Sequence, residues 1–330
     1  MDVDIIQQIR ERASKQTKTI VFPESGDPRV LQAASYLVEE NICDIKLLGN
    51  REELISSEKK AVRESVKRLS DYFIEEGLER DLLINHLYNR RKQKGISREE
   101  AEAKLKDPLY LGALLVATGA ANGCVAGSIA TTGDVIRAAI HSIGLREGND
   151  TVSSTFLMAL KNQPPLTYAD CGVVPYPNAE QLADIAIESA RTHLLLTQEK
   201  PKVAMLSFST NGSAENEMSD KVVKATKLAR DKDSGYMIDG EMQFDAAFVP
   251  SVGEKKFKGS KVAGHANTFI FPDLNSGNIG YKIAQRLGNF EAMGPVLAGL
   301  NKPVNDLSRG CSAEDAYNTA IITAAQSVLD

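Results

Sequence analysis

Apolar positions along the chain alternate between short continuous runs and longer stretches with helical spacing. Residues 19–24 predict a first strand, and residues 44–49 predict a second strand that ends on a glycine. Between them, Pro28 suits the first turn of a helix, where its missing N–H leaves no hydrogen bond unmade. Because a strand–helix–strand order favours a parallel sheet with crossover helices, the predicted fold class is α/β.

The rest of the chain continues this alternation. Residues 51–106 are charge-rich and mostly helical in pattern, whereas 153–160 and 166–174 alternate like neighbouring antiparallel strands. A polar loop at residues 146–150 marks a candidate domain boundary. Further strands are expected at 123–128, 202–209, 267–272 and 303–307, and further helices at 180–196, 219–232, 275–288 and 313–329.

Composition and charge limit the classes of function. A chain of 330 residues is long enough for two domains, and a net charge of -5 argues against a nucleic-acid partner. The four cysteines contain no CxxC pair and the four histidines are scattered, so neither a disulfide framework nor a zinc site is expected. The N-terminus is charged, and no apolar run approaches the ~18 residues that span a bilayer. A cytoplasmic protein that does not enter a membrane is therefore expected.

Two helix starts have the residues to bind an anion. Residues 128–134 combine Ser128, Thr131 and Thr132 with a glycine, which suits a phosphate or equally a simple N-terminal cap. Arg137 falls just over one turn into that helix and needs an anion or an acidic partner. Residues 275–282 open another helix, on which Lys282 and Arg286 share one face.

Two further charge clusters have competing interpretations. The basic residues 89–94 are either a solvated helix end or a patch for an anionic substrate tail. Glu241 and Asp245 would lie on one face of a helix and hold a divalent metal there, although residues 246–250 do not favour a helix.

The stretch 305–315 carries the densest chemistry, because it offers a hydroxyl, a guanidinium, a thiol and a carboxylate in one loop. Ser312 and Asp315 have the spacing of a capping box, which would explain both as helix-capping residues. Arg309 lies beside the positive end of the last helix, a costly place for a cation unless an anion joins it. Cys311 is either a nucleophile activated by that helix start or a packed, unreactive thiol.

Several long motifs in this chain are similar to those of the phosphate acetyltransferase (phosphotransacetylase) family. They cover nearly the whole chain, least typically at 55–90, and the most specific are residues 204–209, 239–248, 277–287 and 303–310. The resemblance implies reversible acetyl transfer between acetyl phosphate and coenzyme A, by direct transfer in a ternary complex. It also implies a homodimer in which coenzyme A is a substrate and no cofactor or metal is permanently bound.

The same resemblance implies two three-layer α/β/α domains with an active-site cleft between them, similar to the isocitrate/isopropylmalate dehydrogenase-like fold. The N-terminal domain would comprise residues 1–148 plus 300–330, and the second domain residues 149–299.

The resemblance also gives the site residues their roles. Asp315 would be the base for the thiol of coenzyme A, Ser308 would stabilise the developing oxyanion, and Arg309 would hold the phosphate. Arg91 and Arg137 match arginines used for substrate anions. The remaining substrate-binding candidates are Ser128, Thr131 and Thr132 on the phosphate side, with Tyr281, Lys282 and Arg286 toward coenzyme A.

Three alternatives remain open at this point. The enzyme could prefer a longer acyl chain such as butyryl, since the acyl pocket is not readable from sequence. It could be a metal- and NAD-dependent β-decarboxylating dehydrogenase, which resembles this family in fold. A non-catalytic module that senses coenzyme A is the third alternative, against which the intact Ser308, Arg309 and Asp315 argue.

Overall fold

The structure is a computed structural model that describes residues 5–74, 79–232 and 235–328. The chain divides into two compact units. One consists of Met1–Ile5 and Arg146–Gly299, and the other of Ile6–Leu145 and Leu300–Asp330. Each unit is an α/β structure with its own sheet, which confirms the predicted fold class. Within the described ranges, no helix has the length and apolar character needed to cross a bilayer.

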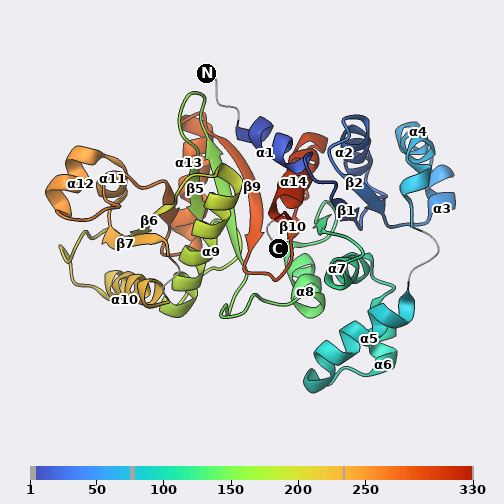
Figure 1. The fold of residues 1–330 in the computed structure, drawn as a ribbon, viewed down its shortest axis with the longest axis horizontal. Helices are drawn as coiled ribbons and strands as arrows, with labels where there is room; N and C mark the ends of the chain where they lie inside the picture. The colour runs from blue at the N-terminus through green and yellow to red at the C-terminus, as the bar shows by residue number, and fades with distance from the viewer. Residues whose placement is uncertain (1–4, 75–78, 233–234, 329–330) are drawn as a thin grey trace. The chain divides into compact units, whose positions relative to one another are not determined.

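The unit of Ile6–Leu145 and Leu300–Asp330 has a four-stranded parallel sheet, in the order β10-β3-β1-β2. Its strands are β1 (Thr19–Phe22), β2 (Asp44–Leu47), β3 (Gly123–Ala126) and β10 (Val304–Asp306). Helices α2 (Pro28–Glu39) and α14 (Ala313–Gln326) cover one face, and α7 (Pro108–Thr118) and α8 (Thr132–Ser142) cover the other (Figure 1). Strand β10 therefore comes from a part of the sequence far from the other three strands of this sheet.

The helix starts in this unit follow from local sequence. Asp27 caps α2 by accepting a hydrogen bond from Arg29 N, and Pro28 occupies the first turn as predicted. Asp107 and Pro108 repeat that arrangement at α7. The other helices of the charge-rich region are α3 (Arg51–Ile55), α4 (Lys60–Arg68), η1 (Ser70–Tyr72), α5 (Arg80–Arg91), η2 (Lys92–Lys94) and α6 (Arg98–Lys104), while α1 (Ile5–Ala13) opens the described chain.

The second unit has a mixed six-stranded sheet in the order β7-β6-β8-β5-β4-β9. Strand β4 (Ser153–Ala159) pairs antiparallel with β5 (Leu166–Ala169), as the alternating pattern predicted, and also with β9 (Glu291–Ala298). The parallel part consists of β6 (Lys202–Leu206), β7 (Met237–Met242) and β8 (Thr268–Ile270) beside β5.

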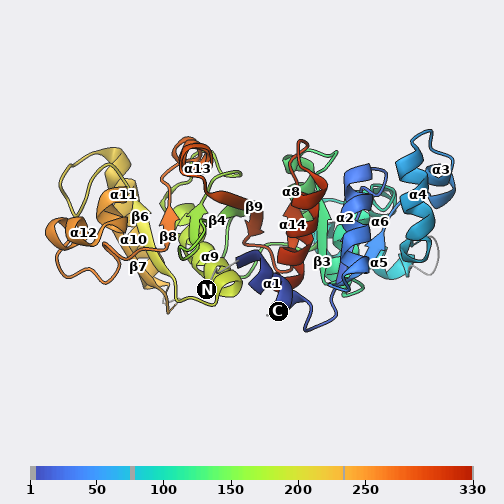
Figure 2. The ribbon, with the colours of Figure 1, turned by 90° about the horizontal axis from the view of Figure 1, so that it is seen from above.

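Helices cover both faces of this mixed sheet and bury one apolar cluster on each (Figure 2). Helices α9 (Ala179–Thr197) and α10 (Glu217–Asp231) pack over one face. Helix α13 (Leu274–Leu287) and the short α11 (Phe244–Phe248) and α12 (Pro250–Lys256) pack over the other. The sheet is therefore buried on both sides, which explains the continuous apolar runs of its strands.

Three features differ from the sequence-based expectation, two in the second unit and one at the end of helix α14. Strand β9 was not predicted, because Gly294 and Pro295 interrupt its pattern; the pairing with β4 is irregular at that point. Glu241 lies on strand β7 and Asp245 on α11, so the idea of a shared helix face was wrong. Helix α14 ends at Gln326, and the predicted end at Leu329 lies outside the described residues.

Candidate active site

Two loops that carry most of the candidate residues leave the same edge of the four-stranded sheet. Strands β3 and β10 pair in parallel, with Asp306 opposite Ala126, and Leu307 N donates to Ala126 O at 2.6 Å. The loop after β3 carries Ser128, Thr131 and Thr132, and the loop after β10 carries Ser308 and Arg309 before α14 begins. Because adjacent parallel strands end side by side, the fold brings these two sequence-distant segments together.

A buried carboxylate organises the loop after β3. Glu24 is 9% exposed, and its oxygens accept hydrogen bonds from the backbone N–H groups of residues 127–130 at 2.7–3.1 Å. The hydroxyl of Ser128 also donates to Glu24, at 3.1 Å, and Ser128 is only 2% exposed. These backbone donors have the character of an anion-binding loop, but the chain's own carboxylate occupies them. The side chain of Ser128 therefore supports the loop rather than facing outward.

Arg29 connects both loops to the start of α2. Its guanidinium donates to the carbonyl oxygens of Arg309 and Cys311, each at 2.8 Å, and to that of Ser128 at 2.9 Å. It also forms an ion pair with Asp27, at 2.6 Å between Nη2 and Oδ2. The planar fork of an arginine suits several fixed acceptors at once, so Arg29 holds the backbone on either side of the site.

A second bridge between the loops lies closer to the strands. Thr132 Oγ1 donates a hydrogen bond to Asp306 Oδ2 at 2.5 Å. Asp306 is 2% exposed, whereas Thr132 at the first position of α8 is exposed. Burial raises the pKa of Asp306 to about 6, with a contribution from the neighbouring carboxylate of Glu24. Thr131 is the N-cap of α8, because its Oγ1 accepts from Asp134 N; the capping interpretation of this residue is confirmed.

The proposed catalytic residues are exposed at the start of α14. Ser308, Arg309 and Asp315 are all exposed, and the Arg309 side chain has no hydrogen-bond or ion-pair partner among the described residues. Ser312 and Asp315 form the predicted capping box: Asp315 N donates to Ser312 Oγ at 3.0 Å, and Ser312 N donates to Asp315 Oδ2 at 2.7 Å. The second carboxylate oxygen of Asp315 takes no part in that box, so one residue can cap the helix and still face solvent.

Cys311 is a packed thiol in this loop. The residue is 8% exposed, and burial raises the pKa of its thiol although Arg29 acts in the opposite direction. Since the thiolate is the nucleophilic form, this environment does not activate it. The interpretation of Cys311 as an unreactive side chain is the better supported one.

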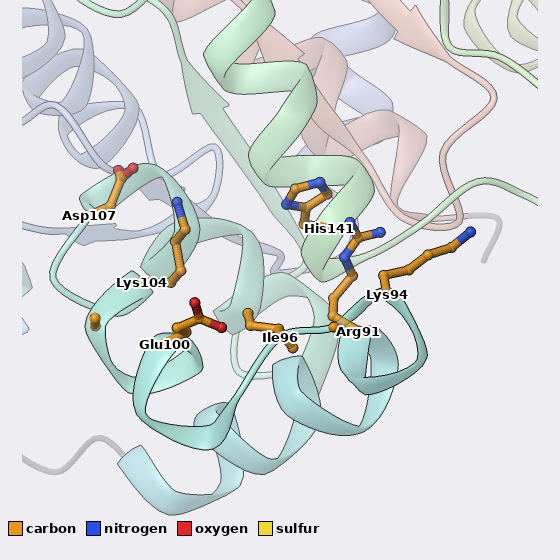
Figure 3. Close-up of a pocket in the computed structure, with 9 residues that line it drawn as sticks. Arg91, Lys94, Ile96, Glu100, Lys104, Asp107 and His141 are labelled. Carbon is orange, nitrogen blue, oxygen red and sulfur yellow. The ribbon is translucent and has the colours of Figure 1, made fainter.

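A basic pocket of about 560 Å³ lies beside the end of α5 (Figure 3). Arg91 and Lys94 come from the end of α5 and from η2, Lys104 from α6, and His141 from the last turn of α8. Its acidic members are engaged with backbone: Glu100 accepts from Ser97 N within a capping box, and Asp107 caps α7. The three cationic side chains therefore outnumber the two carboxylates, and both carboxylates are held by backbone donors.

His141 in this pocket has a hydroxyl partner and cationic neighbours. Its Nδ1 lies 2.8 Å from the hydroxyl of Tyr110, whose ring also lies under Lys104 Nζ at 4.8 Å from the centroid. Burial lowers the pKa of His141, and the positive charges of Arg91 and Lys104 contribute. The pocket therefore already repels a further cation and favours an anion.

The remaining candidates occupy different surroundings. Arg137 forms an ion pair with Asp134, at 2.6 Å, which supplies the acidic partner that the sequence called for. In the other unit, Lys282 and Arg286 are exposed on α13, but Tyr281 is 9% exposed and stacks on Phe156 with centroids 4.2 Å apart. Tyr281 is thus part of the core, where its ring is not a surface available to substrate.

The acidic pair of that unit has structural contacts. Glu241 is buried and accepts hydrogen bonds from Ser209 Oγ and Gly212 N, both at 2.8 Å. Asp245 pairs with Lys256 at 3.0 Å. Within the described ranges, no group of three or more potential metal-ligating side chains is found.

Sequence reasoning missed the residues that hold the loops, namely Glu24, Arg29 and Asp306. Glu24 was predicted only as the end of the first strand, Arg29 only as part of the helix that Pro28 begins, and Asp306 only as part of the stretch 305–315. A charged residue directly after a buried strand is the signal that could have found Glu24 and Asp306, because strand ends in α/β sheets carry function.

Known proteins resemble this chain over nearly its full length. The profile of the family described as "Phosphate acetyl/butaryl transferase" matches residues 4–324. Proteins named phosphate acetyltransferase from Acetivibrio thermocellus and Bacillus subtilis are 46% and 45% identical, each covering 98% of this chain, with 98% and 99% of the relative covered. A crystal structure titled as a phosphotransacetylase from Streptococcus pyogenes has a TM-score of 0.90 at 44% identity, covering 99% of this chain and 98% of that one.

These findings confirm the family resemblance inferred from the motifs, and the chain is an enzyme of the transferase class. The loop after β10 and the first turn of α14 expose a hydroxyl, a guanidinium and a carboxylate, on Ser308, Arg309 and Asp315. The chain belongs to the phosphate acetyl/butaryl transferase family.

Proposed function

We propose that this protein catalyses the reversible transfer of an acetyl group between acetyl phosphate and coenzyme A. The observation that carries the proposal is the convergence of the segments after β3 and β10 at one edge of the sheet, where Thr132, Ser308 and Arg309 are exposed. Full-length relatives named phosphate acetyltransferase support the same reaction.

In this proposal Arg309 binds the phosphate of acetyl phosphate. Its guanidinium is exposed and lacks a partner among the described residues, so it is available for a charge-assisted bond to phosphate oxygens. As the acetyl carbon is attacked, Ser308 donates to the carbonyl oxygen on which negative charge develops. Thr131 and Thr132 line the phosphate side at the start of α8, where helix N–H groups favour an anion.

Asp315 serves as the base for the thiol of coenzyme A. A free thiol has a pKa near ~8.5, so at neutral pH a positioned carboxylate assists attack by removing the proton as the thioester forms. The thiol sulfur bonds to the acetyl carbon, and the bond from that carbon to the phosphate oxygen breaks. The departing phosphate stays bound to the guanidinium of Arg309. The transfer is direct, in a ternary complex, and Cys311 is not acylated, in keeping with its burial.

The anionic part of coenzyme A is assigned to basic side chains outside the strand-end loops. The pocket with Arg91, Lys94 and Lys104 supports this assignment, because its acidic members are committed to backbone. Arg137 is assigned to substrate anions as well, and would exchange its ion pair with Asp134 for the substrate. In the other unit, the exposed Lys282 and Arg286 are the candidates that face coenzyme A.

We also infer a domain arrangement and an assembly. Domains of residues 1–148 plus 300–330 and 149–299, of the isocitrate/isopropylmalate dehydrogenase-like fold, would form the active-site cleft between them. The protein would act in the cytoplasm as a homodimer, with coenzyme A as a substrate and no permanently bound cofactor.

The test is an assay of purified protein with acetyl phosphate and coenzyme A, followed by thioester absorbance. Turnover is expected for the wild type, with butyryl phosphate compared in parallel because the family description covers both acyl groups. A higher kcat/KM for butyryl phosphate would change the acyl preference but not the reaction. Absence of thioester formation with either acyl phosphate would refute the proposal.

A further inference from the structure

The carboxyl group of Asp306 is a buried titratable group that the roles above leave unused. Its Oδ2 accepts the hydrogen bond from Thr132 Oγ1 at 2.5 Å, and its Oδ1 has no hydrogen-bond partner among the residues described. A buried oxygen without a partner is costly, most of all on an ionised carboxylate. The geometry therefore gives Asp306 a reason to hold a proton.

The charged surroundings of Asp306 act in the same direction. Glu24 contributes a second buried carboxylate near it, and burial with this neighbour raises the pKa of Asp306 to about 6. Strand β10 packs against β3, α8 and α14. The other titratable or charged groups on these elements and on the following loop are Cys124, Asp134, Arg137, His141, Arg309, Cys311, Glu314, Asp315 and Tyr317. Asp134 and Arg137 pair with each other, and Glu24 is the charge that contributes to the raised pKa of Asp306.

The protonation state of Asp306 decides which way the hydroxyl of Thr132 can point. Thr132 has one O–H donor and two lone pairs. When Asp306 is ionised, the hydroxyl donates inward to Oδ2, and only lone pairs face outward. When Oδ2 carries the proton, it donates to Thr132 Oγ1, and the O–H of Thr132 is free to donate outward. Protonation thus converts an exposed acceptor at the start of α8 into an exposed donor.

We propose that Thr132 and Asp306 form a proton-linked anion site: a phosphate or acyl phosphate oxygen accepts a hydrogen bond from Thr132 while Asp306 holds a proton taken up from the buffer. The buffer acid loses the proton, Asp306 Oδ2 gains it, and no covalent bond of the ligand changes. The site rests on the proposed function, which assigns Thr132 to the phosphate side, and adds Asp306 as a positioning residue. The helix N-terminus at Thr132 favours the same ligand charge.

The test is calorimetric titration with sulfate in two buffers of different ionisation enthalpy. Sulfate is the probe because it stays a dianion across the range, whereas phosphate itself titrates. At pH 7 binding is expected to take up about one proton per site, and at pH 5, where Asp306 is already protonated, close to none. Sulfate affinity should fall by up to about tenfold for each pH unit above ~6.

Variants separate this linkage from a merely structural role. Asp306→Asn cannot take up a proton in either orientation of its amide, so proton uptake should vanish and the affinity should become independent of pH. Thr132→Val should abolish both the uptake and most of the affinity, and Thr132→Ser should restore them. The matched control is Asp81→Asn, which removes a carboxylate whose side chain is 89% exposed and should behave as the wild type. Thermal unfolding of each variant shows whether it is folded.

Three results would overturn the inference. They are sulfate binding without proton uptake at pH 7 in the wild type, uptake that survives in Asp306→Asn, and failure of sulfate to bind a wild-type protein that turns over. Wild-type turnover with acetyl phosphate and coenzyme A is measured on the same preparation. If turnover is present and the linkage is absent, only the proton-linked site fails; if turnover is absent, the proposed function fails.

Discussion

Arg29 donates a hydrogen bond from Nη1 to the carbonyl oxygen of Arg309 at 2.8 Å, although 280 positions of sequence separate the two residues. The same guanidinium holds the carbonyl oxygens of Ser128 and Cys311. The backbone of the proposed phosphate-binding residue is therefore fixed by a side chain that does not need to touch the substrate. Small displacements of a reacting group lower rates strongly, so this bridge should matter for catalysis.

Replacing Arg29 tests that bridge. Arg29→Lys keeps the charge but cannot reach several acceptors at once, so kcat/KM in the thioester assay should fall by roughly 10- to 100-fold. The matched control is Arg68→Lys, because Arg68 forms an exposed ion pair with Glu39 at the opposite end of α2 from Arg29. Wild-type kcat/KM in Arg29→Lys would show that the backbone of Arg309 is positioned by other contacts.

The capping and catalytic roles of Asp315 can be measured separately. Ser312→Ala removes the hydroxyl of the capping box and should lower the free energy of unfolding by about 1 kcal/mol with little change in kcat. Asp315→Asn can still accept from Ser312 N but cannot act as a base, so kcat should fall by about 10²- to 10⁴-fold with a smaller loss of stability. Denaturant unfolding and the thioester assay give the two quantities. Equal losses of activity in both variants would point to a capping role alone.

Replacement of Cys311 distinguishes direct transfer from an acyl-cysteine route. Because the thiol is buried and its pKa is raised, Cys311→Ala should retain turnover within a few-fold of the wild type. Cys43→Ala, at another buried thiol that lies between α2 and β2 in the chain, controls for the general effect of losing a packed sulfur. An inactive but folded Cys311→Ala, together with acetylated protein detected by mass spectrometry, would refute direct transfer.

Glu24 should be required for the conformation of the loop after β3. In Glu24→Gln, the amide group presents N–H donors to backbone N–H groups that now bond to a carboxylate, so part of the set stays unpaired. We expect the free energy of unfolding to fall by about 2–3 kcal/mol, with reduced turnover. Glu39→Gln at an exposed ion pair is the control. Unchanged stability in Glu24→Gln would mean that the loop holds its shape without the charge.

The raised pKa of Asp306 predicts a pH dependence of stability. Folding raises the pKa from an ordinary 3.8 to about 6, so the folded state binds the proton more tightly than the unfolded state. The stability that this provides is fully present below pH ~4 and is lost as the pH rises through ~6, an effect on the order of 3 kcal/mol. The difference in unfolding free energy between the wild type and Asp306→Asn, measured from pH 4 to 7.5, isolates it. A pH-independent difference would contradict the raised pKa.

Local sequence patterns predicted most helices and strands, because caps, turns and hydrophobic spacing depend on residues that are close in sequence. The parallel pairing of β1 and β2 followed from a strand, a proline-started helix and a second strand, and the capping box followed from the spacing of Ser312 and Asp315. Strand β9 was missed because the Gly294–Pro295 pair has the signature of a break. Only its pairing with β4 makes it a strand.

The sequence supplied candidate residues for the site one by one, but not their arrangement. The family resemblance pointed to Ser308, Arg309 and Asp315. Nothing in the local sequence indicated that Glu24 would accept the hydrogen bonds of the backbone N–H groups beside Ser128. Tyr281 shows the converse, since its place in a motif suggested a contact with substrate and tertiary packing buried its ring on Phe156. Contacts between segments far apart in sequence decided both cases.

The position of β10 at the edge of its sheet has a consequence for how the enzyme is made. Strand β10 and helix α14 are the last elements of the described chain, but they complete a unit whose other strands belong to its first half. A ribosome delivers the chain from its N-terminus, and early segments can fold before late ones emerge. Ser308, Arg309 and Asp315 therefore emerge only after strands β1 to β3 and the whole of Arg146–Gly299 have been made. A nascent or prematurely terminated chain can hold a folded second unit and still lack the means to consume acetyl phosphate.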